Sequence, residues 1–136
     1  MDKVLNYLGL ARKGGMAELG EEPVGAAARA GKAHVILVAS DASDHTWRRS
    51  LSYAAGTDQQ CIRLPHSKDE MGLATGRTSL AIAAITDAQL ALSLVCALPQ
   101  PPEKAVEVLN SKVERLKQRK AEAKAHKVNV RFGKKK

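Results

Sequence analysis

Aromatic residues and cysteines are scarce in this chain of 136 residues. Aromatics make up 3% of it, and the two cysteines are Cys61 and Cys96. Two cysteines are too few for a disulfide framework, so we expect both to be reduced, buried core residues. Because rings are so few, we expect a core of Ala, Leu, Val and Ile and no aromatic platform on which bases could stack.

Long apolar runs are also missing. No stretch reaches about 18 consecutive apolar residues, so we expect no helix that spans a membrane. Residues 1–4 lack the basic and apolar segments of a signal peptide, which makes a cytoplasmic location the expectation. The length suits one compact domain.

Sequence motifs for cofactor or catalytic chemistry are absent as well. No Gly-rich loop ends in Lys followed by Ser or Thr, as a phosphate-cradling nucleotide site requires. The histidines are scattered along the chain, at His34, His45, His66 and His126. Neither cysteine lies near a histidine in the sequence. We therefore expect no cofactor, no metal and no catalytic residues, and we predict that the protein is not an enzyme.

The net charge of +8 is concentrated in the last quarter of the chain. Residues 103–136 hold 12 Lys and Arg but four Asp and Glu, whereas residues 1–102 hold ten of each sign. Three prolines lie between these parts, within residues 98–102, and they stiffen the backbone. We predict a neutral domain over residues 1–98, a Pro-rich linker over 99–102 and a basic helical arm over 103–136.

Apolar periodicity predicts alternating helices and strands within residues 1–98. Strands are expected near residues 16–18 and over residues 35–39, 61–64 and 80–85. Helices are expected over about residues 2–13, 20–30, 44–55, 67–76 and 86–98, with Asp2, Ser43, Ser67 and Asp87 among the residues that cap them. On the third helix we expect Trp47 and Leu51 to face the core. This alternation indicates an α/β domain with a central sheet.

The arm has an apolar stripe over its first turns and cations beyond it. Val106, Leu109, Val113 and Leu116 follow heptad spacing and then stop, so we expect the first half of the arm to dock on the domain. The second half is expected to project as a solvated helix, residues 128–132 to form a short strand, and the last residues to be disordered. The candidate RNA-binding residues of the whole arm are Lys112, Arg115, Lys117, Arg119, Lys120, Lys124, Lys127, Arg131, Lys134, Lys135 and Lys136. A purely solubilising helix is the alternative.

Four stretches of the sequence together resemble a known family. They are Leu8-Gly9-Leu10-Ala11-Arg12-Lys13-Gly14-Gly15, Gly20-Glu21-Glu22-Pro23-Val24, Val35-Ile36-Leu37-Val38-Ala39-Ser40-Asp41-Ala42-Ser43, and residues 70–77 followed by 83–87. In order and spacing they resemble the ribosomal protein L-seven-Ae superfamily, and within it the small bacterial relatives, over about residues 2–98. The resemblance implies a three-layer α-β-α sandwich around a small mixed sheet, which binds kinked RNA helices.

The resemblance also implies where RNA would bind. The family contacts RNA at the start of the second helix, with polar side chains beside it, and at an apolar loop after the fourth helix. Carried over to this sequence, these positions are Arg12, Lys13, Gly20, Glu21, Glu22, Leu73, Ala74, Gly76 and Arg77.

The sequence departs from the family motif Gly-x-Asn-Glu-x-x-Lys at the second helix. Gly20 is retained, but Glu22, Pro23 and Ala26 occupy the positions of the Asn, the Glu and the Lys. Ala26 lacks the cation that would pair with phosphate, and the carboxylates of Glu21 and Glu22 repel phosphate. We therefore predict weakened recognition of kink-turns, with the arm supplying most of the affinity for structured, ribosomal RNA. The alternative is a protein-interaction adaptor that has kept the fold and lost kink-turn binding, with a protein partner at the former RNA face.

Overall fold

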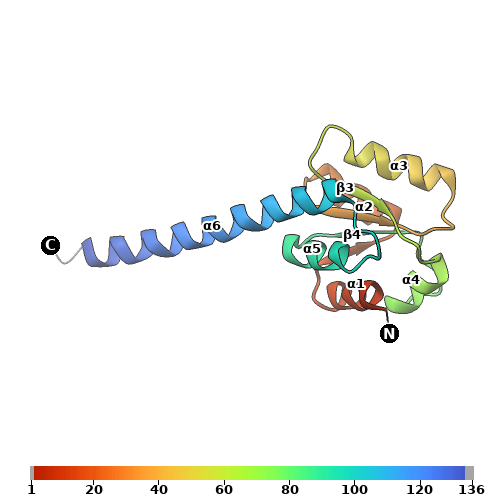
Figure 1. Ribbon diagram of the computed structural model, residues 1–136, viewed down its shortest axis with the longest axis horizontal. Coiled ribbons are helices and arrows are strands. Elements are labelled where there is room, and N and C mark those ends of the chain that lie inside the picture. Colours follow the sequence, from red (N-terminus) through yellow and green to blue (C-terminus); the bar gives the residue numbers. More distant parts are fainter. Residues whose placement is uncertain (1, 134–136) are drawn as a thin grey trace.

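The computed structural model describes the backbone of residues 2–133 and the side chains of residues 2–124. Figure 1 shows a compact body from which the last helix projects. Along the chain the elements are α1 (Lys3–Lys13), β1 (Ala17–Leu19), α2 (Glu21–Arg29), β2 (Val35–Val38), α3 (Asp44–Ala54), β3 (Gln60–Arg63), α4 (Lys68–Ala74), β4 (Ile82–Ile85), α5 (Ala88–Cys96) and α6 (Glu103–Gly133). Within residues 2–133, no helix has both the length and the apolar character needed to cross a bilayer.

The four strands form one mixed sheet in the order β1-β4-β2-β3. β2 runs parallel to β3, with Val35 opposite Gln60, and antiparallel to β4, with Val35 opposite Ile85. β1 pairs antiparallel with β4 at the other edge. Every residue of β2 and β4 is buried, which is why both read as continuous apolar runs in the sequence.

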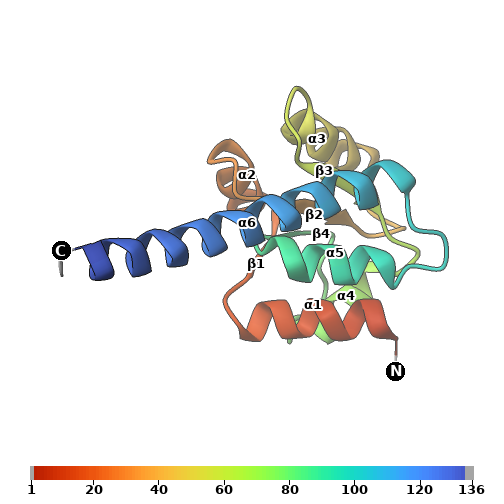
Figure 2. The same ribbon diagram turned by 60° about the vertical axis from the view of Figure 1, so that its left-hand side comes forward.

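Alternate residues of the central strands point into two separate cores. Val35 and Leu37 pack with α1, α4, α5 and the start of α6, whereas Ile36 and Val38 pack with α2 and α3. Helices thus cover both faces of the sheet, as Figure 2 shows. The three-layer α-β-α sandwich with a C-terminal helical extension is therefore confirmed.

The helices begin at the caps that the sequence predicts. Asp2 accepts hydrogen bonds from the N–H groups of Val4 and Leu5, and Asp87 accepts one from Leu90. Ser67 and Glu70 form a complete capping box at α4. These polar side chains are therefore engaged in holding helix ends.

Three local expectations are wrong. α3 buries Thr46 and Ser50 against the sheet and leaves Leu51 45% exposed, because the Ser50 hydroxyl accepts a hydrogen bond from the Cys61 thiol of β3 at 2.9 Å. Cys96 is exposed at the end of α5, and Cys61 is only partly buried. Residues 128–132 continue α6 instead of forming a strand. Alternation of apolar and polar residues over five positions favours a strand only weakly, and the uninterrupted run of helix-forming residues before them favours a helix more strongly.

Candidate nucleic-acid interface

Two arginines and two glycines meet beside the start of α2. A Cβ atom built on Gly20 would lie 3.7 Å from Nη1 of Arg77, and one built on Gly76 would lie 3.6 Å from Nη2 of Arg12. Both glycines have positive φ angles, of 97° and 75°, which L side chains rarely adopt. We call these four residues the body cluster. It brings together three segments, namely the end of α1, the start of α2 and the turn after α4.

The start of α2 offers backbone donors to this cluster. Gly20 is its N-cap and provides no side-chain cap. The N–H groups of Glu21 and Glu22 therefore have no capping partner, whereas Pro23 has no N–H and Val24 donates to the carbonyl of Gly20 at 3.1 Å. Unpaired donors and the positive end of the helix dipole favour an anion here.

One of the two acidic residues at this helix start is already engaged. The hydroxyl of Thr46 donates to Glu21 Oε1 at 3.0 Å, and Arg49 Nη1 pairs with Glu21 Oε2 at 3.1 Å. Both partners lie on α3. The charge of Glu21 is thus partly compensated, and Glu22 remains the exposed carboxylate that opposes phosphate.

An apolar groove lies next to the body cluster, between α1 and α4. It has a volume of about 580 Å³ and is bordered by Leu10, which is 55% exposed, and Leu73, which is 84% exposed. Lys13 lines it as well, and Ala74 is half-buried there. Gly9 permits this close approach of the helices, since a Cβ built on it would lie 3.0 Å from the Ala74 carbonyl oxygen.

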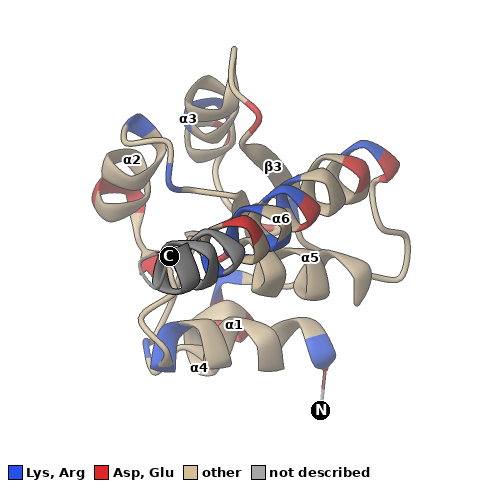
Figure 3. Cartoon of the chain, turned by 90° about the vertical axis from the view of Figure 1, so that its left-hand side faces the viewer, with Lys and Arg blue, Asp and Glu red and all other residues tan. Residues whose placement is uncertain are grey.

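The arm is docked at its root and exposed beyond it. Ala105 and Leu109 are buried in the same core as α1 and α5, and Val113 is also buried. From Glu114 to Lys124 every side chain is exposed, and this segment holds five Lys and Arg but two Glu. Figure 3, which looks toward the end of α6, shows basic positions recurring along this helix.

The cations of the arm differ in their accessibility. Lys112 is 7% exposed and its Nζ atom pairs with Asp58 Oδ1 at 3.3 Å, so it holds the arm to the body. Arg115 shares the same carboxylate at 4.0 Å. Among the described side chains no carboxylate pairs with the remaining ones, which are Lys117, Arg119, Lys120 and Lys124. Lys127 and Arg131 lie on α6 with side chains outside the described residues, and Lys134, Lys135 and Lys136 lie wholly outside them.

The body cluster and the root of the arm lie at opposite ends of α2. Gly20 precedes this nine-residue helix, whereas Gly31, which follows it, lines a hollow against α6. A helix of this length spans about 13 Å. In Figures 1 and 2, α6 projects beyond the C-terminal end of α1.

Comparison with solved structures places this geometry in a known fold. The chain is similar to a protein of unknown function from Bacillus halodurans, with a TM-score of 0.69 and 24% identity, covering 74% of this chain and 100% of that one. It is also similar to the 15.5 kD RNA-binding protein of Giardia lamblia, with a TM-score of 0.56 and 17% identity, covering 83% of this chain and 86% of that one. The likeness shows a shared fold. No family model matches the chain, and no curated protein does.

Two contacts at these sites escaped sequence reasoning. Glu21 and Arg49 are 28 residues apart, and Lys112 and Asp58 are 54 apart, so no local pattern joins either pair. The sequence holds one weak sign of the second pair: Lys112 lies between Leu109 and Val113, on the apolar stripe of the arm. A lysine at such a position needs a partner once the stripe docks.

Proposed function

We propose that this chain is a non-enzymatic RNA-binding protein that contacts structured RNA, ribosomal RNA being the expected target, through the body cluster and the arm. The observation that carries the proposal is the projecting segment of α6, whose cations at positions 117, 119, 120 and 124 are exposed and have no carboxylate partner among the described side chains. Phosphate contacts of this kind supply affinity and position the protein, but they carry little sequence information.

The body cluster supports the same proposal. Arg77 is exposed beside the helix donors at the start of α2, and the exposed Arg12 lies beside Gly76, the residue before Arg77, which is an arrangement that favours phosphate. Similarity of fold to an RNA-binding protein of Giardia lamblia adds to this support. We propose that kink-turn recognition is weakened, because Glu22, Pro23 and Ala26 are exposed at the place where the motif would act.

The proposal is tested by titrating a labelled kink-turn RNA and a plain duplex of equal length with the full chain. Binding should be strong at low salt and weaken as salt rises. Replacing Arg12 and Arg77 with Gln should weaken kink-turn binding about tenfold, since two charge-assisted contacts are lost. The control is Arg29→Gln with Arg48→Gln, which removes the same charge from exposed positions away from the cluster. Absence of binding to either RNA at low salt would refute the proposed function.

A gain of function tests the loss of the kink-turn motif. Pro23 and Ala26 are exposed and three residues apart, so their side chains are neighbours on α2. Pro23→Glu with Ala26→Lys leaves the net charge unchanged, so duplex affinity should stay constant while the preference for the kink-turn rises roughly fivefold. The matched control carries Gln at both positions. An unchanged preference in a variant whose circular dichroism shows it to be folded means that the motif is wrongly placed.

A protein-interaction adaptor is the second candidate, and the groove between α1 and α4 favours it. Leu10 and Leu73 expose large apolar surfaces there, which an interaction partner would cover. A protein partner that stays bound at high salt and is lost with Leu73→Asp would favour this candidate. It would be favoured further if replacing Lys117, Arg119, Lys120 and Lys124 with Gln left RNA binding unchanged.

A further inference from the structure

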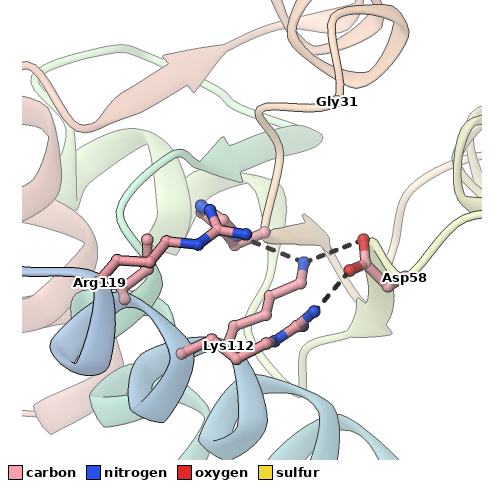
Figure 4. A pocket seen from close by; sticks show the side chains of 7 residues that line it. Gly31, Asp58, Lys112 and Arg119 are labelled. Atoms are coloured by element: carbon pink, nitrogen blue, oxygen red, sulfur yellow. Dashed lines mark hydrogen bonds and ion pairs between the residues drawn. The ribbon is translucent and has the colours of Figure 1, made fainter. Parts of the chain in front are cut away.

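A small polar hollow lies where the arm leaves the body. It has a volume of about 230 Å³, which is below the range of sites for drug-sized ligands. Figure 4 shows it between α6, the turn after α2 and the loop before β3. The residues that line it are Gly31, His34, Asp58, Lys112, Arg115, Leu116 and Arg119.

The floor of the hollow is a buried ammonium with two partners. Lys112 Nζ lies 3.3 Å from Asp58 Oδ1 and 3.3 Å from His34 Nδ1. An ammonium group can only donate, so His34 accepts through Nδ1 and is neutral. The pKa of His34 is lowered mainly by burial of its ring and secondly by the charge of Lys112. The imidazole is therefore neutral at neutral pH. One N–H of Lys112 is left without a partner among the described side chains.

The hollow carries more positive than negative charge. Lys112, Arg115 and Arg119 are spaced by three and four residues, so they share one face of α6. Asp58 is the single acidic residue of the lining, and its side chain is 60% exposed. In Figure 4 the side chain of Arg119 points toward the same space as Lys112. With His34 neutral, the lining has an excess of two positive charges.

We propose that this hollow is a binding site for a phosphate group. A phosphate dianion would balance the excess charge, take the unpartnered N–H of Lys112 and accept paired hydrogen bonds from the planar guanidinium of Arg119. Free phosphate and a phosphate monoester can carry this charge, whereas a phosphodiester of an RNA backbone is a monoanion that can accept the same hydrogen bonds and would balance half of the excess. The site stands apart from the body cluster. It shares Arg119 with the arm cations that carry the proposed function, but binding of free phosphate there does not require that function.

The test is a titration of the full chain with sodium phosphate, followed by NMR of His34 and of the arginine Nε–Hε groups. Sodium chloride of equal ionic strength is the reference. The Arg115, Arg119 and His34 signals should shift and saturate together, and Arg119→Gln should weaken binding about fivefold. Lys104→Gln, which removes an equal charge from an exposed position on the first turn of α6, should not. Equal weakening by both variants, or no saturable shift at all, would overturn the site.

A second variant tests the charge balance itself. Asp58→Asn removes the carboxylate that competes with phosphate for Lys112 and Arg115, so phosphate should bind several-fold more tightly. Thermal unfolding of the same variant checks that α6 remains docked. If the variant unfolds at an unchanged temperature but binds phosphate more weakly, Asp58 does not compete with phosphate for the cations of the hollow, and the proposed charge balance is wrong.

Competition identifies the source of the phosphate group. A duplex RNA added to the phosphate-loaded protein should displace phosphate if the site holds the RNA backbone, so that the Arg119 signal no longer depends on the phosphate concentration. If the phosphate shift persists at saturating RNA, the ligand is a free phosphate or a monoester. If the full chain binds no RNA but Arg119 still responds to phosphate, the proposed function fails and the site stands.

Discussion

Replacing Lys117, Arg119, Lys120 and Lys124 with Gln should lower the affinity for RNA on the order of 10²-fold at about 100 mM salt. These side chains are exposed on the part of α6 that projects from the body. Each cation that meets a phosphate releases a counterion, and this release sets the salt dependence. The slope of log affinity against log salt should therefore flatten by roughly 3 if all four contacts form.

The matched control removes four cations from the body instead. Lys3, Arg29, Lys32 and Arg48 are exposed and lie outside the body cluster and the arm, so replacing them with Gln gives the same net charge. Fluorescence anisotropy at several salt concentrations measures both variants. If the control loses as much affinity and as much slope as the arm variant, the attraction comes from total charge and the arm has no special role.

The docked root of α6 makes this design sharper than deletion of the arm. Removing residues 103–136 would also remove Ala105 and Leu109, which belong to the core of the body. A deletion would therefore confuse lost phosphate contacts with lost stability. Replacement of exposed side chains by Gln leaves the buried contacts of α6 in place.

The fold could be predicted from the sequence because its central strands and most of its helix starts have characteristic local sequence patterns. The apolar runs at Val35–Val38 and Ile82–Ile85 are strands buried on both faces, and capping residues precede most of the helices. On α3, Trp47 packs against the core as expected, but Leu51 was misjudged because the face toward β3 carries Ser50, which accepts a hydrogen bond from Cys61. Hydrophobic periodicity gives no information about such a face.

The candidate site could be predicted from the sequence only in part. The resemblance pointed to Gly20 and Arg77, which the fold brings together although they are far apart in sequence. It gave no sign that Glu21 is paired with Arg49 or that Lys112 is buried against Asp58. Pairings of this kind depend on how α3 and α6 pack, and a single sequence does not record that packing.

Leu109→Ala should destabilise the whole protein by about 2–5 kcal/mol, because this side chain is fully buried where α6 meets the body. Truncation removes apolar contacts and leaves a cavity among residues that cannot fully collapse into it. For a chain of this size such a loss lowers the melting temperature by roughly 10 °C. Thermal and denaturant unfolding, followed by circular dichroism, measure the change.

Leu116→Ala is the control, since it removes the same atoms from a side chain that is 39% exposed, two turns further along α6. Its cost should be well below that of Leu109→Ala, on the order of 1 kcal/mol, because 39% of the residue already contacts water and truncation leaves no enclosed cavity. A cost at Leu109 as small as the one at Leu116 would mean that the root of α6 adds nothing to the core and that the body is complete before the Pro-rich linker. A large cost confined to Leu109 would make the arm an anchored helix, whose cations project from the body in a fixed direction.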